Sequence, residues 1–262
     1  MSSSSTPILP AAQSFRLDGG QVGVLILHGY GGTPADYRAI AEQLHQHGYT
    51  VSVPLLAGHG RGQEALRSTT VAACQESALT EVQQLAQQCS KIILLGSSFG
   101  GVLALDVAEQ YQMVHGLVLV NTALSYSGGG IFQGIALRIL RLFRPDYPKK
   151  GLSAAEREYA ASVGSAPAWP INGILATSSF AQKTVIPGLS KVRIPTLILH
   201  SHADPIVGTK NSQLIANRIG SSDVRVETIS VATHRPFRDQ AAVESMANQT
   251  IDFIQAHIAS KS

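Results

Sequence analysis

The sequence predicts an α/β fold, in which a mostly parallel sheet of six to eight strands is covered by helices on both faces. Two observations predict it. Short apolar runs alternate with segments of helical periodicity, and the runs are apolar throughout, as in strands buried on both faces. The alternation breaks once, between residues 124 and 194. We therefore expect residues 1–262 to form a single domain, with a core of residues 14–123 and 195–262 and a helical cap inserted at 124–194.

The individual elements are placed by their periodicity and their boundary residues. SFRLDGG predicts a short edge strand. A helix is expected over residues 34–48, because Pro34 suits a first helical turn and Gly48 suits a helix end. Buried strands are expected in QVGVLILHG, YTVSVPLL, KIILLGS, HGLVLVNTA, PTLILHSHAD and VRVETIS. Further helices are expected over residues 69–88, from about residue 99, around 211–219 and over 239–258.

The stretch at 124–194 has helical pieces but no clear strand. It contains an apolar helix with arginines, IFQGIALRILRLF, and a segment with several prolines. Ligands of open α/β sheets bind beyond the carboxyl ends of the strands, so a cap at this place would roof the site.

The composition excludes several classes of protein. The chain is 44% hydrophobic and 14% charged, and its net charge of +3 comes without a dense Lys/Arg block, so we expect no nucleic-acid binding. The N-terminus lacks the features of a signal peptide, and no apolar run approaches 18 residues, so no stable membrane insertion is expected. Cys74 and Cys89 are expected in one helix, about 22 Å apart, which is too far for a disulfide. This cysteine usage, without metal-ligand spacing, favours the cytoplasm.

The pentapeptide Gly96-Ser97-Ser98-Phe99-Gly100 fits the pattern G-x-S-x-G. It lies between an apolar run and a helical segment, so Ser98 is expected on a sharp turn that holds its hydroxyl out above the sheet. The glycines leave room for the tight backbone, and the helix that begins near Phe99 aims N–H groups at whatever Ser98 attacks. The pattern alone is weak in a Gly- and Ser-rich chain, where an ordinary turn is the alternative. The order of strand, turn and helix favours a nucleophile.

A serine nucleophile needs a base, and with this kind of turn the partners follow in the order Ser, Asp/Glu, His. His234 lies in a loop directly after the last expected strand, at the same sheet edge as Ser98. His115 and His200 flank or lie within strands, where a structural role is more common, and His257 lies in the last helix. We therefore expect His234 to be the base.

The base in turn needs an acid that orients it. Asp204 ends the strand PTLILHSHAD, again at the edge where Ser98 is expected. Some related enzymes place the acid one strand earlier, but that position holds Asn121 and Thr122, which cannot ionise. Asp204 is therefore expected to hold His234 in the tautomer that accepts the serine proton.

An oxyanion hole needs two backbone N–H donors. One is expected from Phe99, the residue after the nucleophile, and the other from Tyr30 in the loop His28-Gly29-Tyr30-Gly31-Gly32. This loop lacks the G-x-G-x-x-G spacing and the Lys-Ser/Thr pair of phosphate-binding loops, so we expect no nucleotide cofactor there. His28 is expected to brace the loop rather than to act as a catalyst.

The motifs LILHGYGG, GHG, GSSFGG, HSHADPIV and THRPF, in this order and at these intervals, resemble the α/β-hydrolase superfamily. Within it they are similar to small microbial carboxylesterases and monoacylglycerol-lipase-like serine hydrolases. The resemblance covers residues 21–123 and 195–258. It implies the α/β-hydrolase fold and ester hydrolysis through an acyl-serine intermediate, without a cofactor. The nucleophile, acid, base and first oxyanion donor would be Ser98, Asp204, His234 and Tyr30.

We therefore expect a serine esterase for carboxylic esters of small or medium acyl chains, acting as a monomer or weak homodimer. Apolar residues of the cap helix, among them Ile131, Ile135 and Leu142, would suit an aliphatic chain, although packing of the cap on the core explains them equally well. Its arginines would steer an anionic substrate, touch a lipid surface or form a solvated face. The alternatives are a thioesterase or acyltransferase with the same residues, a C–C-bond hydrolase, and a slow-turnover ligand receptor.

Overall fold

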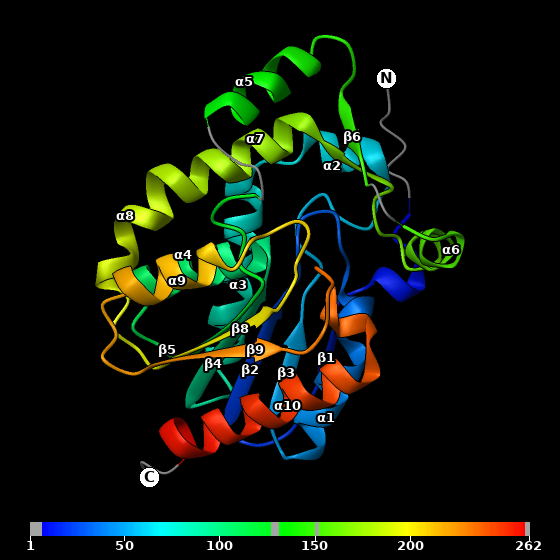
Figure 1. The fold of residues 1–262 in the computed structure, drawn as a ribbon. Coiled ribbons are helices and arrows are strands. Elements are labelled where there is room, and N and C mark those ends of the chain that lie inside the picture. Colours follow the sequence, from blue (N-terminus) through cyan, green and yellow to red (C-terminus); the bar gives the residue numbers. More distant parts are fainter. Residues whose placement is uncertain (1–6, 127–130, 150–151, 260–262) are drawn as a thin grey trace.

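The computed structural model describes residues 7–126, 131–149 and 152–259 (Figure 1). Its centre is a seven-stranded sheet in the order β1-β3-β2-β4-β5-β8-β9, in which β1 pairs antiparallel with β3 and the other neighbours are parallel. The expected α/β-hydrolase architecture is confirmed. The strands are β1 (Phe15–Leu17), β2 (Val22–Leu27), β3 (Thr50–Val53), β4 (Lys91–Ser97), β5 (Val114–Val120), β8 (Thr196–Ser201) and β9 (Val224–Ile229).

Helices cover both faces of the sheet, and each presents an apolar side to it. On one face, α1 (Arg38–Gln46) packs beside α10 (Gln240–Ile254). On the other face lie α3 (Val71–Ala86), α4 (Phe99–Gln110) and α9 (Lys210–Arg218) (Figure 1). The buried residues of β4 alternate between the two cores, with Leu94 in one and Leu95 in the other, which explains why the strand is apolar throughout.

The register of the sheet brings several strand ends to one edge. Leu27 at the end of β2 pairs with Gly96, and Ser97 at the end of β4 pairs with Val120. β8 and β9 end together at that edge, opposite each other. The loops that follow β2, β4, β5, β8 and β9 therefore converge on the same rim of the sheet, where ligands bind in open parallel sheets.

The segment at 124–194 contains a small sheet, so the expectation that it has no strand was wrong. β6 (Asp146–Pro148) and β7 (Ala168–Pro170) pair antiparallel, with Tyr147 opposite Trp169. The helices α5 (Ile131–Leu140) and α6 (Ala154–Ser162) belong to the same segment, and α5 lies beyond the carboxyl edge of the main sheet (Figure 1). The short helix α2 (Gln63–Ser68) approaches β7 from the core part of the chain.

A continuous helical run ends this segment and contributes to the core. It comprises α7 (Ile171–Phe180), a π-helical turn (Ala181–Val185), α8 (Ile186–Gly188) and a final 3-10 turn. Pro187 does not break the run, because the wider turn before it accommodates the missing N–H and the ring. Ala181, Val185 and Leu189 are buried in the apolar core beside α4.

The two cysteines do not lie in one helix. Cys74 lies in α3, but Cys89 lies three residues beyond its end, and both are buried free thiols. Within the described ranges, no helix is long and apolar enough to cross a membrane.

Candidate active site

Ser98 occupies a strained turn between β4 and α4. Its φ of 54° and ψ of −117° lie in a region that a residue other than glycine rarely adopts. The turn is held by its main chain, because the Ser98 N–H donates to the Val120 carbonyl at 2.9 Å and the Ser98 carbonyl accepts from Ala123 N at 3.2 Å. These hydrogen bonds hold Ser98 in its strained conformation. The turn directs the serine hydroxyl toward the loops at the sheet edge.

The glycines around Ser98 allow α4 to pack closely against the strands. A Cβ atom on Gly100 would lie 2.0 Å from the Leu27 carbonyl oxygen, and one on Gly96 would lie 2.4 Å from the Gly100 carbonyl oxygen. Both neighbours are backbone atoms, which cannot move aside. The two glycines of the pentapeptide are thus required by the close approach of backbone segments.

Three side chains from different loops meet at this turn. The distance from His234 Nε2 to Ser98 Oγ is 3.0 Å, and the distance from His234 Nδ1 to Asp204 Oδ2 is 2.6 Å. The Asp204 side chain is fully buried, and 12% of the His234 side chain is exposed. Because Nδ1 faces a carboxylate, it carries the hydrogen, which leaves Nε2 free to accept from the serine hydroxyl. The residues nominated from the sequence as nucleophile, acid and base are therefore in contact.

Asp204 is held as a carboxylate by several donors. Its Oδ1 accepts hydrogen bonds from Ile206 N at 2.7 Å and from Val207 N at 2.9 Å. Burial by itself would raise the pKa of Asp204, but the hydrogen bonds from His234 and these amides outweigh it and hold the pKa below its ordinary value. His200 lies beneath this loop and is bonded to the Val207 carbonyl at 2.9 Å, a structural role as expected.

Asn121 is a residue of this site that the sequence analysis did not identify. It is fully buried at the end of β5, with a φ of 46°. Its Nδ2 donates to Ser201 Oγ at 3.0 Å and reaches the carbonyl oxygens of His234 and Thr233 at 3.4 and 3.5 Å, while its Oδ1 accepts from Ser201 N at 2.8 Å. An Asn directly after a buried strand was the available signal, since Asn tolerates a positive φ.

The backbone segments expected to form an oxyanion hole adjoin Ser98. A Cβ atom on Gly29 would be 3.3 Å from Ser98 Cβ, so the backbone that leads into Tyr30 passes directly against the serine. Phe99 is the first residue of α4, so its N–H has no helical partner four residues earlier. Trp169 Nε1 donates to the Tyr30 carbonyl at 3.2 Å and fixes the orientation of this loop from β7.

His28 braces the loop from below, as expected. Its Nδ1 donates to the Gly29 carbonyl at 3.0 Å, and its Nε2 accepts from Leu56 N at 3.0 Å. Burial lowers the pKa of His28 to about 4 and that of His59 to about 3, and the two rings contact each other edge-on with centroids 4.9 Å apart. Both imidazoles are therefore neutral at physiological pH.

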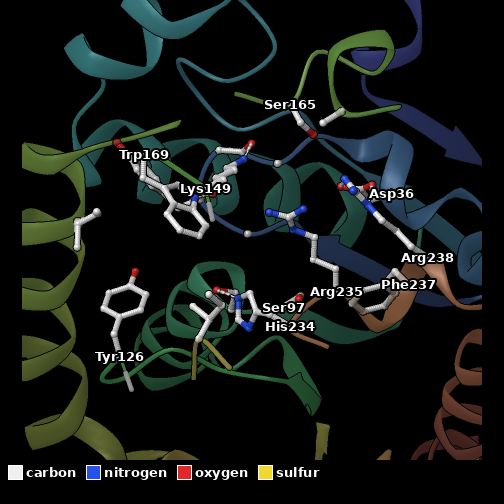
Figure 2. A pocket seen from close by; sticks show the side chains of 18 of the residues that line it. Asp36, Ser97, Tyr126, Lys149, Ser165, Trp169, His234, Arg235, Phe237 and Arg238 are labelled. Atoms are coloured by element: carbon white, nitrogen blue, oxygen red, sulfur yellow. Dashed lines mark hydrogen bonds and ion pairs between the residues drawn. The ribbon is translucent and has the colours of Figure 1, made fainter. Parts of the chain in front are cut away.

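A cavity of about 250 Å³ opens over Ser98 and His234 (Figure 2). Tyr126 lies on one side of His234, and Asp36 and Arg238 lie on the other. Within the ranges that the structure describes, no group of three or more His, Cys, Asp or Glu side chains could hold a metal ion. The lining is apolar at Tyr126, Leu137, Trp169, Ile174, Pro205, Ile206 and Phe237, and charged at Asp36, Lys149, Arg235 and Arg238.

The helix α5 contributes less to this cavity than its apolar sequence indicates. Ile135 in α5 and Leu142 just beyond it are 45% and 74% exposed, so neither of the two roles considered for them, roofing the serine or packing on the core, is filled. Leu137 is the residue of α5 that lines the cavity. The side chain of Ile131 lies outside the described residues.

The model of a family described as serine aminopeptidase, S33, matches residues 21–241. The chain belongs to this family. A thermostable monoacylglycerol lipase of Bacillus sp. (strain H-257) is 30% identical over 231 residues, which are 87% of this chain and 88% of the lipase. A carboxylesterase of Bacillus subtilis (strain 168) is 23% identical over 84% of this chain and 87% of its own length.

Solved members of the wider superfamily share the fold. A structure described as that of LipS and LipT, two metagenome-derived lipolytic enzymes, superimposes with a TM-score of 0.84 at 26% identity, and covers 96% of this chain and 100% of its own. A monoacylglycerol lipase of Paleococcus ferrophilus has a TM-score of 0.76 at 19% identity, and covers 93% and 98% of the two chains. The S33-family chain is thus a hydrolase of the lipase and esterase type, as the sequence motifs predicted.

Proposed function

We propose that the protein is a serine esterase that hydrolyses carboxylic esters of small or medium apolar acyl chains through an acyl-Ser98 intermediate. The observation that carries this proposal is the continuous chain of contacts from Asp204 through His234 to Ser98 Oγ. A base within hydrogen-bond reach of a hydroxyl, and itself oriented by a buried carboxylate, is the arrangement that activates serine for acyl transfer.

In the proposed reaction, His234 Nε2 takes the hydroxyl proton while Ser98 Oγ attacks the ester carbonyl carbon. The negative charge that develops on the carbonyl oxygen is stabilised by the amides of Tyr30 and Phe99. The imidazolium, held by Asp204, then gives its proton to the departing alcohol, which leaves the acyl group on Ser98. A water molecule repeats the sequence and releases the acid and the free serine.

The cavity supports the proposed size and polarity of the acyl chain. Its volume of about 250 Å³ is below the range typical of sites for drug-sized ligands. Leu137 and Ile174, from the segment that we propose to be the cap, line it together with Ile206 from the core. A short aliphatic chain would contact mostly apolar side chains there.

The test is a series of p-nitrophenyl esters with acyl chains of two to twelve carbons, assayed with the wild type and with Ser98→Ala. We expect kcat/KM to peak at a short or medium chain and to fall at least about 10⁴-fold in the variant. Ser97→Ala is the matched control, because Ser97 lines the same cavity while the hydrogen bonds of the His234 ring go to Ser98 and Asp204, and we expect it to cost less than about tenfold.

Covalent labelling separates the proposed enzyme from a receptor on the same scaffold. A fluorophosphonate probe should label the wild type and Ser97→Ala, but not Ser98→Ala. Turnover that survives in Ser98→Ala would contradict the proposal. Labelling without turnover on any ester would favour the receptor, and faster turnover of a matched thioester would favour a thioesterase.

A further inference from the structure

The part of the cavity beyond His234 carries an excess of positive charge. Lys149, Arg235 and Arg238 line it, and Asp36 is the one carboxylate among the lining residues that the structure describes. Figure 2 shows Arg235 between Lys149 and the Asp36–Arg238 pair, with its guanidinium directed into the cavity. We call these four residues the basic lobe.

Arg238 is the anchored member of the basic lobe. Its Nε donates to Asp36 Oδ1 at 2.9 Å, its Nη2 reaches Asp36 Oδ2 at 3.4 Å, and its guanidinium carbon lies 4.7 Å from the centre of the Tyr159 ring. Its Nη1 is buried and has no hydrogen-bond partner among the described residues. A buried guanidinium donor without an acceptor is costly, so this nitrogen has capacity for a further anionic group.

Arg235 is the unpaired member. No ion pair or side-chain hydrogen bond joins its guanidinium to the part of the chain that the structure describes. Burial and the neighbouring charge of Arg238 lower its pKa, which shows that its surroundings disfavour the positive charge. It directly follows His234 in the chain, so a group bound to Arg235 would lie close to the reacting ester.

Lys149 completes the lobe from the other side. Its Nζ donates to the Gly31 carbonyl at 3.1 Å and lies 5.5 Å from the centre of the Trp169 ring. Burial, together with the charges of Arg235 and Arg238, lowers its pKa to about 7. A bound anion would favour the charged form of this amine.

The nearby carboxylates do not balance these three cations. Asp36 is engaged by Arg238, as described above. Glu156 is close enough to influence Arg235 and Arg238, but it is exposed, and its Oε2 caps α6 by accepting from Ser153 N at 2.8 Å. The charge of the lobe therefore stays positive, and it faces a cavity that also contains the serine hydroxyl.

We propose that the basic lobe binds an anionic group, a carboxylate or a phosphate, carried by the ester substrate itself. This inference rests on the proposed function and names its substrate class, an ester that is apolar on one side of the scissile bond and negatively charged on the other. Arg235 is the principal contact, because a free guanidinium offers paired donors that match the oxygens of either group. Arg238 Nη1 and Lys149 Nζ supply further donors.

Two matched substrate pairs test the inference and separate the two anions. Butyl butyrate is compared with 4-butyryloxybutanoate, whose alcohol part ends in a carboxylate, and 1-butyrylglycerol is compared with 1-butyrylglycerol 3-phosphate, so that both anions lie on the alcohol side of the same butyryl ester. We expect kcat/KM of the charged member to exceed that of its neutral partner by about tenfold or more in one pair, chiefly through a lower KM. The pair that responds identifies the carboxylate or the phosphate, and the preference should shrink as salt is added.

Arg235→Gln should reduce the charged-to-neutral ratio by about tenfold or more. Arg138→Gln removes the same charge from the exposed face of α5 and should leave the ratio unchanged. Lys149→Met is a second variant of the lobe that should lower the ratio, in case Arg235→Gln folds poorly. Circular dichroism checks the fold of each variant.

Neutral preference in both pairs, or a ratio that Arg235→Gln and Lys149→Met leave unmoved, would overturn the inference. That failure differs from failure of the proposed function. Hydrolysis of the neutral esters alone, dependent on Ser98, would support the proposed esterase function and contradict the anion site. If none of the four substrates were hydrolysed in a Ser98-dependent way, both proposals would be wrong.

Discussion

The side-chain nitrogen of Asn121 lies 3.4 Å from the main-chain carbonyl oxygen of His234. The same amide group holds Ser201 through both its nitrogen and its oxygen. Asn121 thereby ties the end of β5 to the end of β8 and to the loop that carries the proposed base. The position of the imidazole relative to Ser98 depends in part on this one buried side chain, which touches none of the reacting atoms.

Replacing Asn121 should therefore reduce catalysis more than substrate binding. We expect Asn121→Ala to lower kcat by about tenfold with little change in KM, because a loosened His234 misaligns the base. Asn121→Gly is the companion variant, since it accepts the φ of 46° without strain while losing the same hydrogen bonds. Equal loss of kcat in both variants would assign the effect to the side chain, and full kcat in Asn121→Gly would contradict the positioning role.

Asp204→Asn should be less damaging than loss of the nucleophile or the base. The amide keeps the shape but removes the charge that stabilises the imidazolium, and we expect kcat/KM to fall by about 10³- to 10⁴-fold, against a larger fall for Ser98→Ala or His234→Ala. Steady-state kinetics on one p-nitrophenyl ester compares the three variants. Asp223→Asn, at the far end of β9, is the control and should be close to wild type. Wild-type activity in Asp204→Asn would mean that another carboxylate orients His234.

The pH dependence of kcat/KM should show one acidic ionisation. Activity rises with pH because only a neutral His234 imidazole can accept the serine proton. The hydrogen bonds to Asp204 hold its pKa below the ordinary value despite its burial, so it stays a carboxylate as the pH falls and adds no ionisation of its own to this limb. We expect the logarithm of kcat/KM to rise with a slope of one and then to level off. A rate that is flat from pH 5 to pH 8, or a slope of two, would contradict this assignment.

The main sheet and the three meeting side chains were predictable because their signals are local. A strand such as β4 is apolar from Ile92 to Leu95, and a serine, an aspartate and a histidine that each follow a strand share one edge of the sheet. β6 and β7 were not predicted because each is three residues long and contains a proline, and because the two strands, in which Tyr147 lies opposite Trp169, pair across some twenty intervening residues.

The role of Asn121 and the basic lobe depend on contacts between distant parts of the chain. The sequence shows only that the Asn121 side chain cannot ionise. Its hydrogen bonds to Ser201 and His234 join parts of the chain that become neighbours only on folding. Lys149 and Arg235 are far apart in the sequence and meet across the cavity, so neither motif nor periodicity could have connected them. The exposed side of α5 illustrates the converse, since its apolar sequence favoured either a roof over the serine or a face packed on the core, and Ile135 is instead 45% exposed.

Gly100→Ala should prevent native packing of the nucleophile turn. The added Cβ would lie 2.0 Å from the Leu27 carbonyl oxygen, which belongs to a central strand. We expect a loss of several kcal/mol in the free energy of unfolding, or failure to fold, because the backbone on both sides is fixed. Gly134→Ala in α5 is the matched control, since nothing lies within 4 Å of its added Cβ, and it should stabilise by about 0.5–1 kcal/mol. Chemical unfolding of both variants measures the difference, and equal stabilities would contradict it.

Stability should fall in acid because of the buried histidines under the Tyr30 loop. In the folded protein, burial lowers the pKa of His28 from its ordinary value of 6.5 to about 4. Between these two pH values the unfolded chain binds a proton at His28 that the folded chain does not. The contribution of the neutral His28 to the free energy of unfolding is therefore complete above pH 6.5 and is lost as the pH falls to about 4. The shift corresponds to roughly 3 kcal/mol.

Urea unfolding at several pH values, followed by the fluorescence of the single tryptophan, measures this dependence. His28→Gln should be less stable than wild type at pH 7, because its contacts with Gly29 and Leu56 are altered, but its stability should change less between pH 6.5 and 4. His47→Gln, at the exposed end of α1, should keep the full wild-type dependence. Equal losses of stability in acid for His28→Gln and the wild type would mean that His28 takes up a proton as readily in the folded chain as in the unfolded chain. A protonated Nε2 could not accept the hydrogen bond from Leu56 N, so this result would contradict the assignment.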